Sequence, residues 1–293
     1  DPEPNFDQVD PSNFTMADRW ILSRMNTVVR EVTENMEKFE LGIGLQKVYE
    51  FIWEQFCDWY IELVKPRLFD RQAKGRLEAL YVLNEVLKTS MKLLHPFMPF
   101  ITEEVYQHLY TEDESIMISS WPVFREELHD PESESKMNTV MEAIRSIRNI
   151  RAEMKVPATR KARAVFVIED NNMGTIFEKE QSTFIRLASV SDFVVLKNRD
   201  QIPEDAVSSV IPGVEIYIPM DELLDFDKEM ERLLKEKENL EAELSRVNGK
   251  LQNESFTAKA PAAVVEAERE KQKKYRELYD KVLERIEFIR GKI

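Results

Sequence analysis

Two stripes of mostly apolar residues in the C-terminal segment constrain the fold of this chain more than any other sequence feature. In residues 223–251, and again in residues 265–293, such residues recur at alternating spacings of three and four. This is the heptad spacing of two α-helices that wind around each other. A short connection, residues 253–261, separates the stripes and brings Pro261 close to the start of the second helix. The pattern therefore predicts an antiparallel coiled-coil hairpin.

The predicted hairpin would be a long projection with little core of its own. At 1.5 Å per residue, a helix of about 30 residues extends about 45 Å. Polar outer faces on such an arm indicate that it reaches for a partner. Self-association through the same apolar stripes is the competing explanation, although each stripe already has a partner within the hairpin.

The rest of the chain divides into a helical part and a mixed part. Helical spacing of apolar residues predicts five helices, at about residues 15–39, 45–64, 74–94, 102–110 and 133–151. Pro66 is expected to end the second helix, because proline removes a backbone donor. After Pro157 the pattern predicts a helix at 175–187 and four strands, at 162–168, 193–196, 206–211 and 214–218.

The predicted fold is mainly α: a helical bundle, a small α+β module and a C-terminal antiparallel coiled-coil hairpin. The predicted boundaries are a linker at 1–13, the bundle at 14–156, the module at 157–220 and the arm at 221–293. The chain begins at Asp1 without an initiator methionine, which suggests a piece of a longer polypeptide.

Composition excludes several classes of site and compartment. The chain of 293 residues has one cysteine, three histidines and seven glycines. These numbers argue against a disulfide framework, a Cys/His metal site and a glycine-rich phosphate loop. No apolar run approaches the roughly 18 residues that cross a membrane. We expect a protein of a reducing, cytoplasmic compartment, with no cofactor of its own.

The net charge of −14 argues, by itself, against nucleic acid as a partner, but two segments are basic. Residues 65–76 hold five basic side chains and one acidic one, and residues 140–163 hold seven against two. Because salt limits the reach of a charge to about 8–10 Å, such segments can meet a polyanion on an acidic body. The alternative is that they are ordinary solvated helix faces.

The stretch FIWEQFCDWYIELVKP, residues 51–66, gathers aromatic residues and the single cysteine. At about 100° per residue, most apolar side chains, Trp53 and Cys57 among them, fall on one core-facing arc. Phe51 falls on the polar face, where an exposed ring could stack on an unpaired base, unless a neighbouring element covers it. Cys57 is expected to be a small buried hydrophobe rather than a nucleophile.

Several of these segments resemble a known family, the class I aminoacyl-tRNA synthetases for branched aliphatic amino acids. The resemblance rests on DRWILSR (18–24), on residues 51–66, on LHPFMPFITEE (94–104), on SIMISSWP (115–122) and on IRSIRNIR (144–151). These segments are similar to the helical anticodon-binding domain of the family. The hairpin with FTAKAP at residues 256–261 is similar to the valyl branch rather than the isoleucyl or leucyl branch.

The resemblance implies binding of a tRNA that accepts valine, with the anticodon loop on the bundle and the tRNA's outer corner on the arm. The candidate contact residues in this sequence are Phe51, Lys65, Arg67, Arg71, Arg145, Arg148, Arg151, Lys155, Phe256, Lys259, Arg269, Lys273, Lys274, Tyr275 and Arg276. The spacing of Arg145, Arg148 and Arg151 is expected to place all three on one helical stripe. That stripe could equally form salt bridges with a catalytic domain elsewhere in a longer chain.

The family's HIGH and KMSKS-type signatures and its editing domain do not occur in this sequence. The resemblance therefore implies that ATP and Mg²⁺ serve a parent enzyme, that its catalytic domain is an intramolecular partner, and that this chain, as a monomer, catalyses nothing. Two alternatives remain open. One is a non-catalytic structural protein whose arm docks another protein, and the other is an enzyme that works through Cys57.

Overall fold

The computed structural model describes residues 4–111, 113–203, 205–223, 226–253, 258 and 260–291, without the side chains of 227 and 228. The chain forms two compact units. Unit 1 comprises residues 1–145, 170–183 and 211–213, and unit 2 comprises residues 146–169, 184–210 and 214–293. Each unit is described by itself below.

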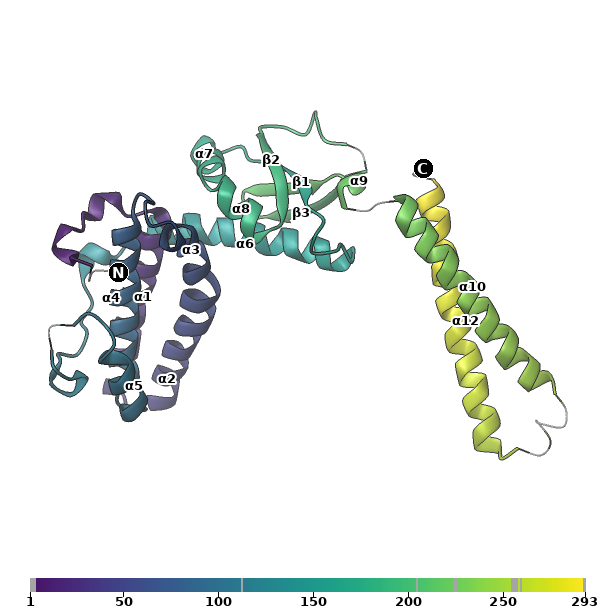
Figure 1. Cartoon of the computed structure of the whole chain (residues 1–293), viewed down its shortest axis with the longest axis horizontal. Coiled ribbons are helices and arrows are strands. Elements are labelled where there is room, and N and C mark those ends of the chain that lie inside the picture. The colour runs from purple at the N-terminus through teal and green to yellow at the C-terminus, as the bar shows by residue number, and fades with distance from the viewer. Residues whose placement is uncertain are drawn as a thin grey trace. The chain divides into compact units, whose positions relative to one another are not determined.

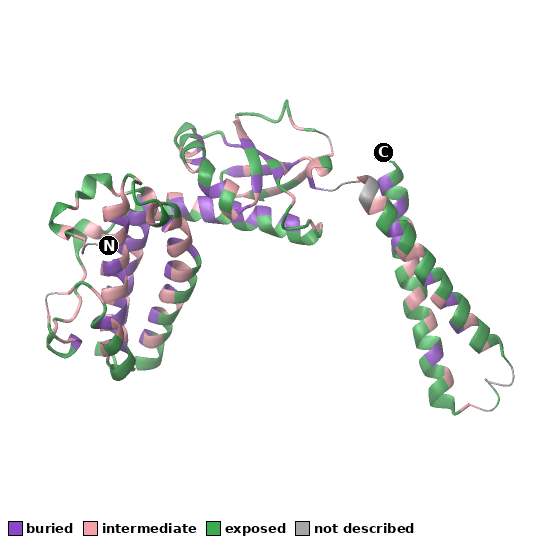
Figure 2. Ribbon diagram, in the orientation of Figure 1, coloured by how far each residue is buried: buried purple, intermediate pink, exposed green. Residues whose placement is uncertain are grey.

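Unit 1 is built around a helical bundle (Figure 1). Its helices are α1 (Met16–Glu37), α2 (Leu41–Glu50), the π-helix η3 (Phe51–Ile61), α3 (Glu62–Phe69), α4 (Arg76–Leu94), α5 (Pro99–Tyr106) and the first part of α6 (Pro131–Glu153). Helix α1 begins where the sequence predicts, because the Thr15 hydroxyl and the Asp18 carboxylate cap each other's backbone. Trp20, Ile21 and Val32 of α1 lie in the core, and Figure 2 shows how buried positions are distributed along the helices of the bundle.

The second predicted helix is longer than expected, and its middle is not an α-helix. Pro66 does not end it, because α2, η3 and α3 follow one another without a break and Pro66 lies inside α3. A π-helix makes a wider turn than an α-helix. A helical wheel drawn at about 100° per residue therefore assigns the side chains of this stretch to the wrong faces. Phe51 is 1% exposed and Trp53 is 52% exposed. The placement of Phe51 on the polar face is therefore wrong, as is that of Trp53 in the core.

The small sheet has the order β2-β1-β4-β3. Its strands are β1 (Ala162–Val167), β2 (Val190–Leu196), β3 (Val207–Ile211) and β4 (Val214–Ile218). Strand β1 pairs parallel with β2 and antiparallel with β4. The helix predicted at 175–187 is two helices, α7 (Asn171–Lys179) and α8 (Gln181–Leu187). Phe184 of α8 packs on Phe166 and Phe193 of the sheet, with ring centroids 5.1 and 5.4 Å away.

The predicted hairpin is present in unit 2 as α10 (Phe226–Gln252) and α12 (Ala262–Arg290), after the short helix α9 (Met220–Leu223). Leu233 and Leu240 of α10 pack against Val282, Ile286 and Ile289 of α12. The seam is the predicted heptad stripe, and the prediction of a mainly α chain with a small α+β module and a helical hairpin is confirmed. Among the described helices, none is long and apolar enough to cross a membrane.

Candidate nucleic-acid interface

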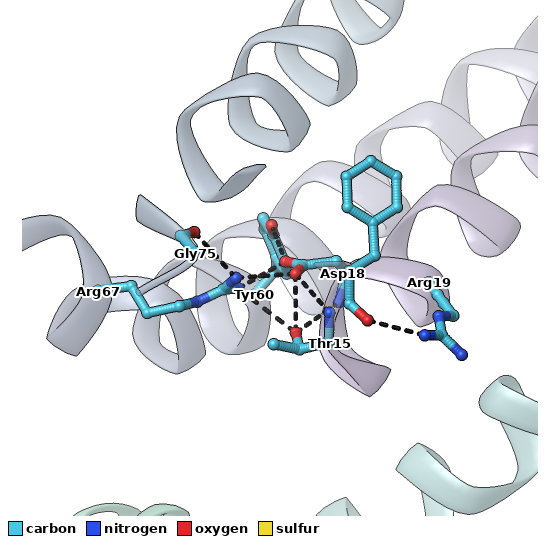
Figure 3. A network of polar contacts seen from close by, with 7 residues as sticks. Thr15, Asp18, Arg19, Tyr60, Arg67 and Gly75 are labelled. Atoms are coloured by element: carbon cyan, nitrogen blue, oxygen red, sulfur yellow. Dashed lines mark hydrogen bonds and ion pairs between the residues drawn. The ribbon is translucent and has the colours of Figure 1, made fainter. Parts of the chain in front are cut away.

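A buried ion pair organises one end of the bundle in unit 1 (Figure 3). Arg67 of α3 donates from Nη2 to Oδ1 of Asp18 at 2.6 Å and from Nη1 to Oδ2 at 2.8 Å. The Tyr60 hydroxyl donates to the same carboxylate at 2.6 Å. Arg67 Nη1 also reaches the carbonyl of Gly75, directly before α4, at 3.3 Å. This network ties the start of α1, the end of η3, α3 and the start of α4 together.

The electrostatics of the network keep the pair charged. Burial raises the pKa of Asp18, but the hydrogen bonds and charge of Arg67 outweigh it, so the pKa lies below its ordinary value. Burial and then the charge of Asp18 raise the pKa of Tyr60 well above its ordinary value, which keeps its phenol protonated. The Arg67 guanidinium is thus committed to a contact within the chain.

The other cations near this end are placed differently. Arg67 itself is 16% exposed in its side chain. Lys65 pairs with Glu62 one turn earlier on the same helix. Arg71 lies exposed in the turn that follows α3. Of the three predicted contact residues at this corner, Arg71 is therefore the exposed one.

The three arginines of α6 do not form the single stripe that the sequence predicts. Residues three apart drift by about 60° per step around an α-helix, so the third member turns away from the first. Arg145 and Arg148 are exposed, whereas Arg151 is buried. The guanidinium of Arg145 lies 5.0 Å from the Trp59 ring centroid, and Arg148 Nε donates to the Leu187 carbonyl at 2.7 Å.

Arg151 holds the turn that follows α6. Its Nη2 donates to the carbonyls of Arg160, at 2.6 Å, and Pro157, at 3.2 Å. Its Nη1 has no hydrogen-bond partner among the described residues, and burial lowers the pKa of the guanidinium. Lys155, in the turn itself, has a φ of 54° and is exposed. Of the predicted contact residues in this segment, Arg145, Arg148 and Lys155 are therefore exposed.

On the hairpin, the predicted cations lie along α12. Arg269, Lys273, Lys274 and Arg276 are exposed, and Arg276 Nε lies 3.4 Å from Oδ1 of Asp280 on the same helix. Tyr275 is half-buried against the core of the hairpin, so its ring is only partly accessible. Phe256 and Lys259 lie outside the described residues.

Sequence reasoning missed one aromatic feature of the bundle. Tyr49 and Trp53 are both exposed, and their ring centroids lie 6.2 Å apart. Their spacing of four residues was a usable signal, but the wheel assigned Trp53 to the core.

The described residues offer binding groups rather than reactive ones. Burial and the charge of Asp58 raise the pKa of the Cys57 thiol, which disfavours the thiolate that a nucleophile needs. No group of three His, Cys, Asp or Glu residues in the described part of the chain could hold a metal ion. Among the predicted contact residues that the structure describes, the exposed cations make two sets, one before the hairpin (Arg71, Arg145, Arg148 and Lys155) and one on α12.

Comparison with known proteins identifies relatives for both parts of the chain. The profile of the anticodon-binding domain of tRNA ligases matches residues 18–166, and that of the valyl-tRNA synthetase tRNA-binding arm matches residues 225–290. The valine–tRNA ligase of Clostridium acetobutylicum is 52% identical over 277 residues, which cover 94% of this chain and 31% of that protein. The ligase of Clostridium perfringens is 50% identical over 95% of this chain and 32% of its own length.

The ligase of Carboxydothermus hydrogenoformans is 45% identical over 88% of this chain and 29% of its own length. The chain thus spans about a third of the length of these relatives. The comparisons give no support to the alternative of a non-catalytic structural protein. Since the first profile covers just over half of the 293 residues, the chain belongs to the family of tRNA ligases that carry this anticodon-binding domain, as the sequence motifs predicted.

Proposed function

We propose that this chain recognises a valine-accepting tRNA as part of a valine–tRNA ligase. The observation that carries the proposal is the combination of two matches in one chain, an anticodon-binding domain at 18–166 and a tRNA-binding arm at 225–290. In this proposal the helical bundle holds the anticodon region. The hairpin holds the outer corner of the tRNA, where its D and T loops meet.

The exposed cations of the two segments supply the attraction for tRNA phosphates. Contacts to phosphates position a nucleic acid and make its affinity depend on salt. Those before the hairpin are Arg71 and Arg145 in unit 1 and Arg148 and Lys155 in unit 2, and those on the hairpin are Arg269, Lys273, Lys274 and Arg276. Arg67, Lys65 and Arg151 support these surfaces through contacts within the chain.

The chemical steps of the ligase reaction belong to other parts of the ligase. Activation of valine with ATP and Mg²⁺ takes place in the two thirds of the ligase that this chain does not span, and that catalytic part is its intramolecular partner. We propose that the chain acts as a monomer in the cytoplasm and holds no cofactor itself.

A salt titration tests whether the chain binds tRNA through phosphates. Fluorescence anisotropy would measure the affinity for labelled valine tRNA between about 50 and 200 mM salt. The logarithm of the association constant should fall by about 0.7–0.9 per log unit of salt for each phosphate that the protein neutralises. The variant Lys273→Gln/Lys274→Gln should reduce that slope by about one to two.

Lys38→Gln is the matched control, because Lys38 is also exposed but lies at the end of α1 and outside both cation sets. It should leave the slope unchanged. Undetectable binding at 50 mM salt, or an affinity that does not change with salt, would contradict the proposal.

A further inference from the structure

The seam of the hairpin in unit 2 changes its chemistry along its length. The base half, residues 226–241 of α10 and 275–290 of α12, is closed by a continuous apolar cluster. The buried members of this cluster are Leu233, Leu240, Val282, Ile286 and Ile289. In the tip half, residues 242–252 and 262–274, α10 still buries Leu244 and Val247, whereas α12 places polar residues on its heptad stripe.

Glu268 and Gln272 are the polar residues on the α12 stripe in the tip half. Glu268 is only 7% exposed. Lys271 donates to its Oε1 at 2.9 Å, and Nζ of Lys250, on α10, lies 3.4 Å from the same atom. Gln272 Nε2 donates to Oδ1 of Asn248, also on α10, at 2.6 Å. A carboxylate and an amide therefore take two consecutive positions of a stripe that is apolar in the base half.

The tip half keeps the helix pairing of the base half. At the border between the halves, the Tyr279 hydroxyl donates to Oε1 of Glu241 at 2.7 Å. Asn248 lies seven residues after Glu241 on α10, and Gln272 lies seven residues before Tyr279 on α12. The two contacts between the antiparallel helices are thus one heptad apart on both, so they share one register. The halves differ in the chemistry of the seam and not in how the helices pair.

A seam that buries a charge closes a hairpin less firmly than an apolar seam. The hydrogen bond from Lys271 and the charge of Lys250 outweigh burial and hold the pKa of Glu268 below its ordinary value, so its carboxylate is charged at neutral pH. Taking a charge out of water costs free energy that an ion pair offsets only in part, and apolar residues in its place are often neutral or stabilising. The tip half is therefore held closed by less free energy than the base half.

We infer that the hairpin consists of a base that stays closed and a tip that opens on its own, with Glu268 and Gln272 as the residues that separate the two. Proteins open locally in cooperative units whose opening free energies differ. The inference concerns the hairpin itself and does not rest on the proposed function. In the ligase proposed above, a tip that opens in this way can adapt its helix ends to the surface that it meets.

Amide hydrogen exchange of the full chain measures the opening of each half. The amides of residues 264–274 should exchange at least about tenfold faster than those of residues 280–289 on the same helix. The variant Glu268→Leu/Gln272→Leu makes the seam apolar and should slow exchange in 264–274 at least about tenfold. Glu266→Leu/Glu270→Leu is the matched control, because both glutamates are exposed on the same helix, and it should leave exchange in 264–274 unchanged.

A second variant should act in the opposite direction. Lys250→Gln removes the partner of Glu268 on α10, so exchange in 264–274 should become several-fold faster while exchange in 280–289 stays the same. Equal exchange rates of the two segments in the wild-type chain would overturn the inference. Unchanged exchange of 264–274 in the Glu268→Leu/Gln272→Leu variant would also overturn it, because the fast exchange would then be ordinary fraying of a helix end.

Discussion

Replacing Asp18 by Asn should destabilise the bundle by about 3 kcal/mol. The carboxylate is fully buried and accepts two hydrogen bonds from Arg67 and one from Tyr60. Removing one partner of a buried ion pair costs about 3–5 kcal/mol, because the other charge is left without compensation. The lower end of that range applies, since the Arg67 side chain remains 16% exposed and water can hydrate part of it.

Urea unfolding followed by tryptophan fluorescence measures this loss in the bundle alone. All four tryptophans, Trp20, Trp53, Trp59 and Trp121, lie within the first 121 residues, so the signal does not report on the sheet or the hairpin. Glu31→Gln is the matched control on the same helix. Its partner Lys47 is 2.8 Å away, but both side chains are about one third exposed, so its loss should be below about 1 kcal/mol.

The pH dependence of the Asp18→Asn effect has a definite sign. Because the folded-state pKa of Asp18 is below the unfolded value of about 3.9, its contribution is fully present above that value and is lost as the pH falls through the folded pKa. The unfolding free energies of the wild-type chain and the Asp18→Asn variant should therefore begin to converge below about pH 4, as the pH falls toward the folded-state pKa of Asp18. A loss under 1 kcal/mol at pH 7, or strict additivity in the Asp18→Asn/Arg67→Gln double variant, would refute the reasoning, since contacting partners should couple by about 2 kcal/mol.

Three further predictions concern other parts of the chain. Phe51→Ala should cost about 3–5 kcal/mol in the same urea assay, whereas Trp53→Ala should cost less than about 1 kcal/mol; the reverse order would refute the π-helical geometry of η3. Arg151→Lys should lower the free energy of opening of the sheet by about 1–3 kcal/mol, because the carbonyls of Arg160 and Pro157 lose a donor. Hydrogen exchange of the β1 amides measures this free energy, and unchanged exchange rates would contradict the prediction. Deleting residues 221–293 should weaken tRNA binding without changing bundle unfolding; if affinity also stays unchanged, the hairpin is not a tRNA contact.

Local patterns in the sequence were sufficient for most of the fold. The heptad stripes predicted α10 and α12, and the spacing of apolar residues at 15–39 predicted α1. Each of these signals repeats within about two helical turns, so it needs no knowledge of distant residues. The stretch at 51–61 failed because the wheel assumed α-helical spacing, and the sequence carries no clear mark of the wider π turn.

The candidate site was less predictable, because its decisive contacts are long-range. Arg67 is a basic residue directly after Pro66, where the sequence predicted the end of a helix, and it was therefore predicted as a tRNA contact; its partner Asp18 is 49 residues away. Arg151 has a local sequence context similar to that of Arg148, but Arg151 donates to carbonyls of the turn after α6, whereas Arg148 donates to the carbonyl of Leu187, 39 residues away. Periodicity gives a residue's helix face but not which distant group will meet it.

Footprinting of a bound tRNA tests the central claim most directly. Hydroxyl-radical cleavage of valine tRNA, with and without a saturating amount of the chain, reports which riboses the protein covers. We expect protection in the anticodon loop and at the outer corner, with the second protection lost when residues 221–293 are deleted. Saturated binding that protects neither region would contradict the account.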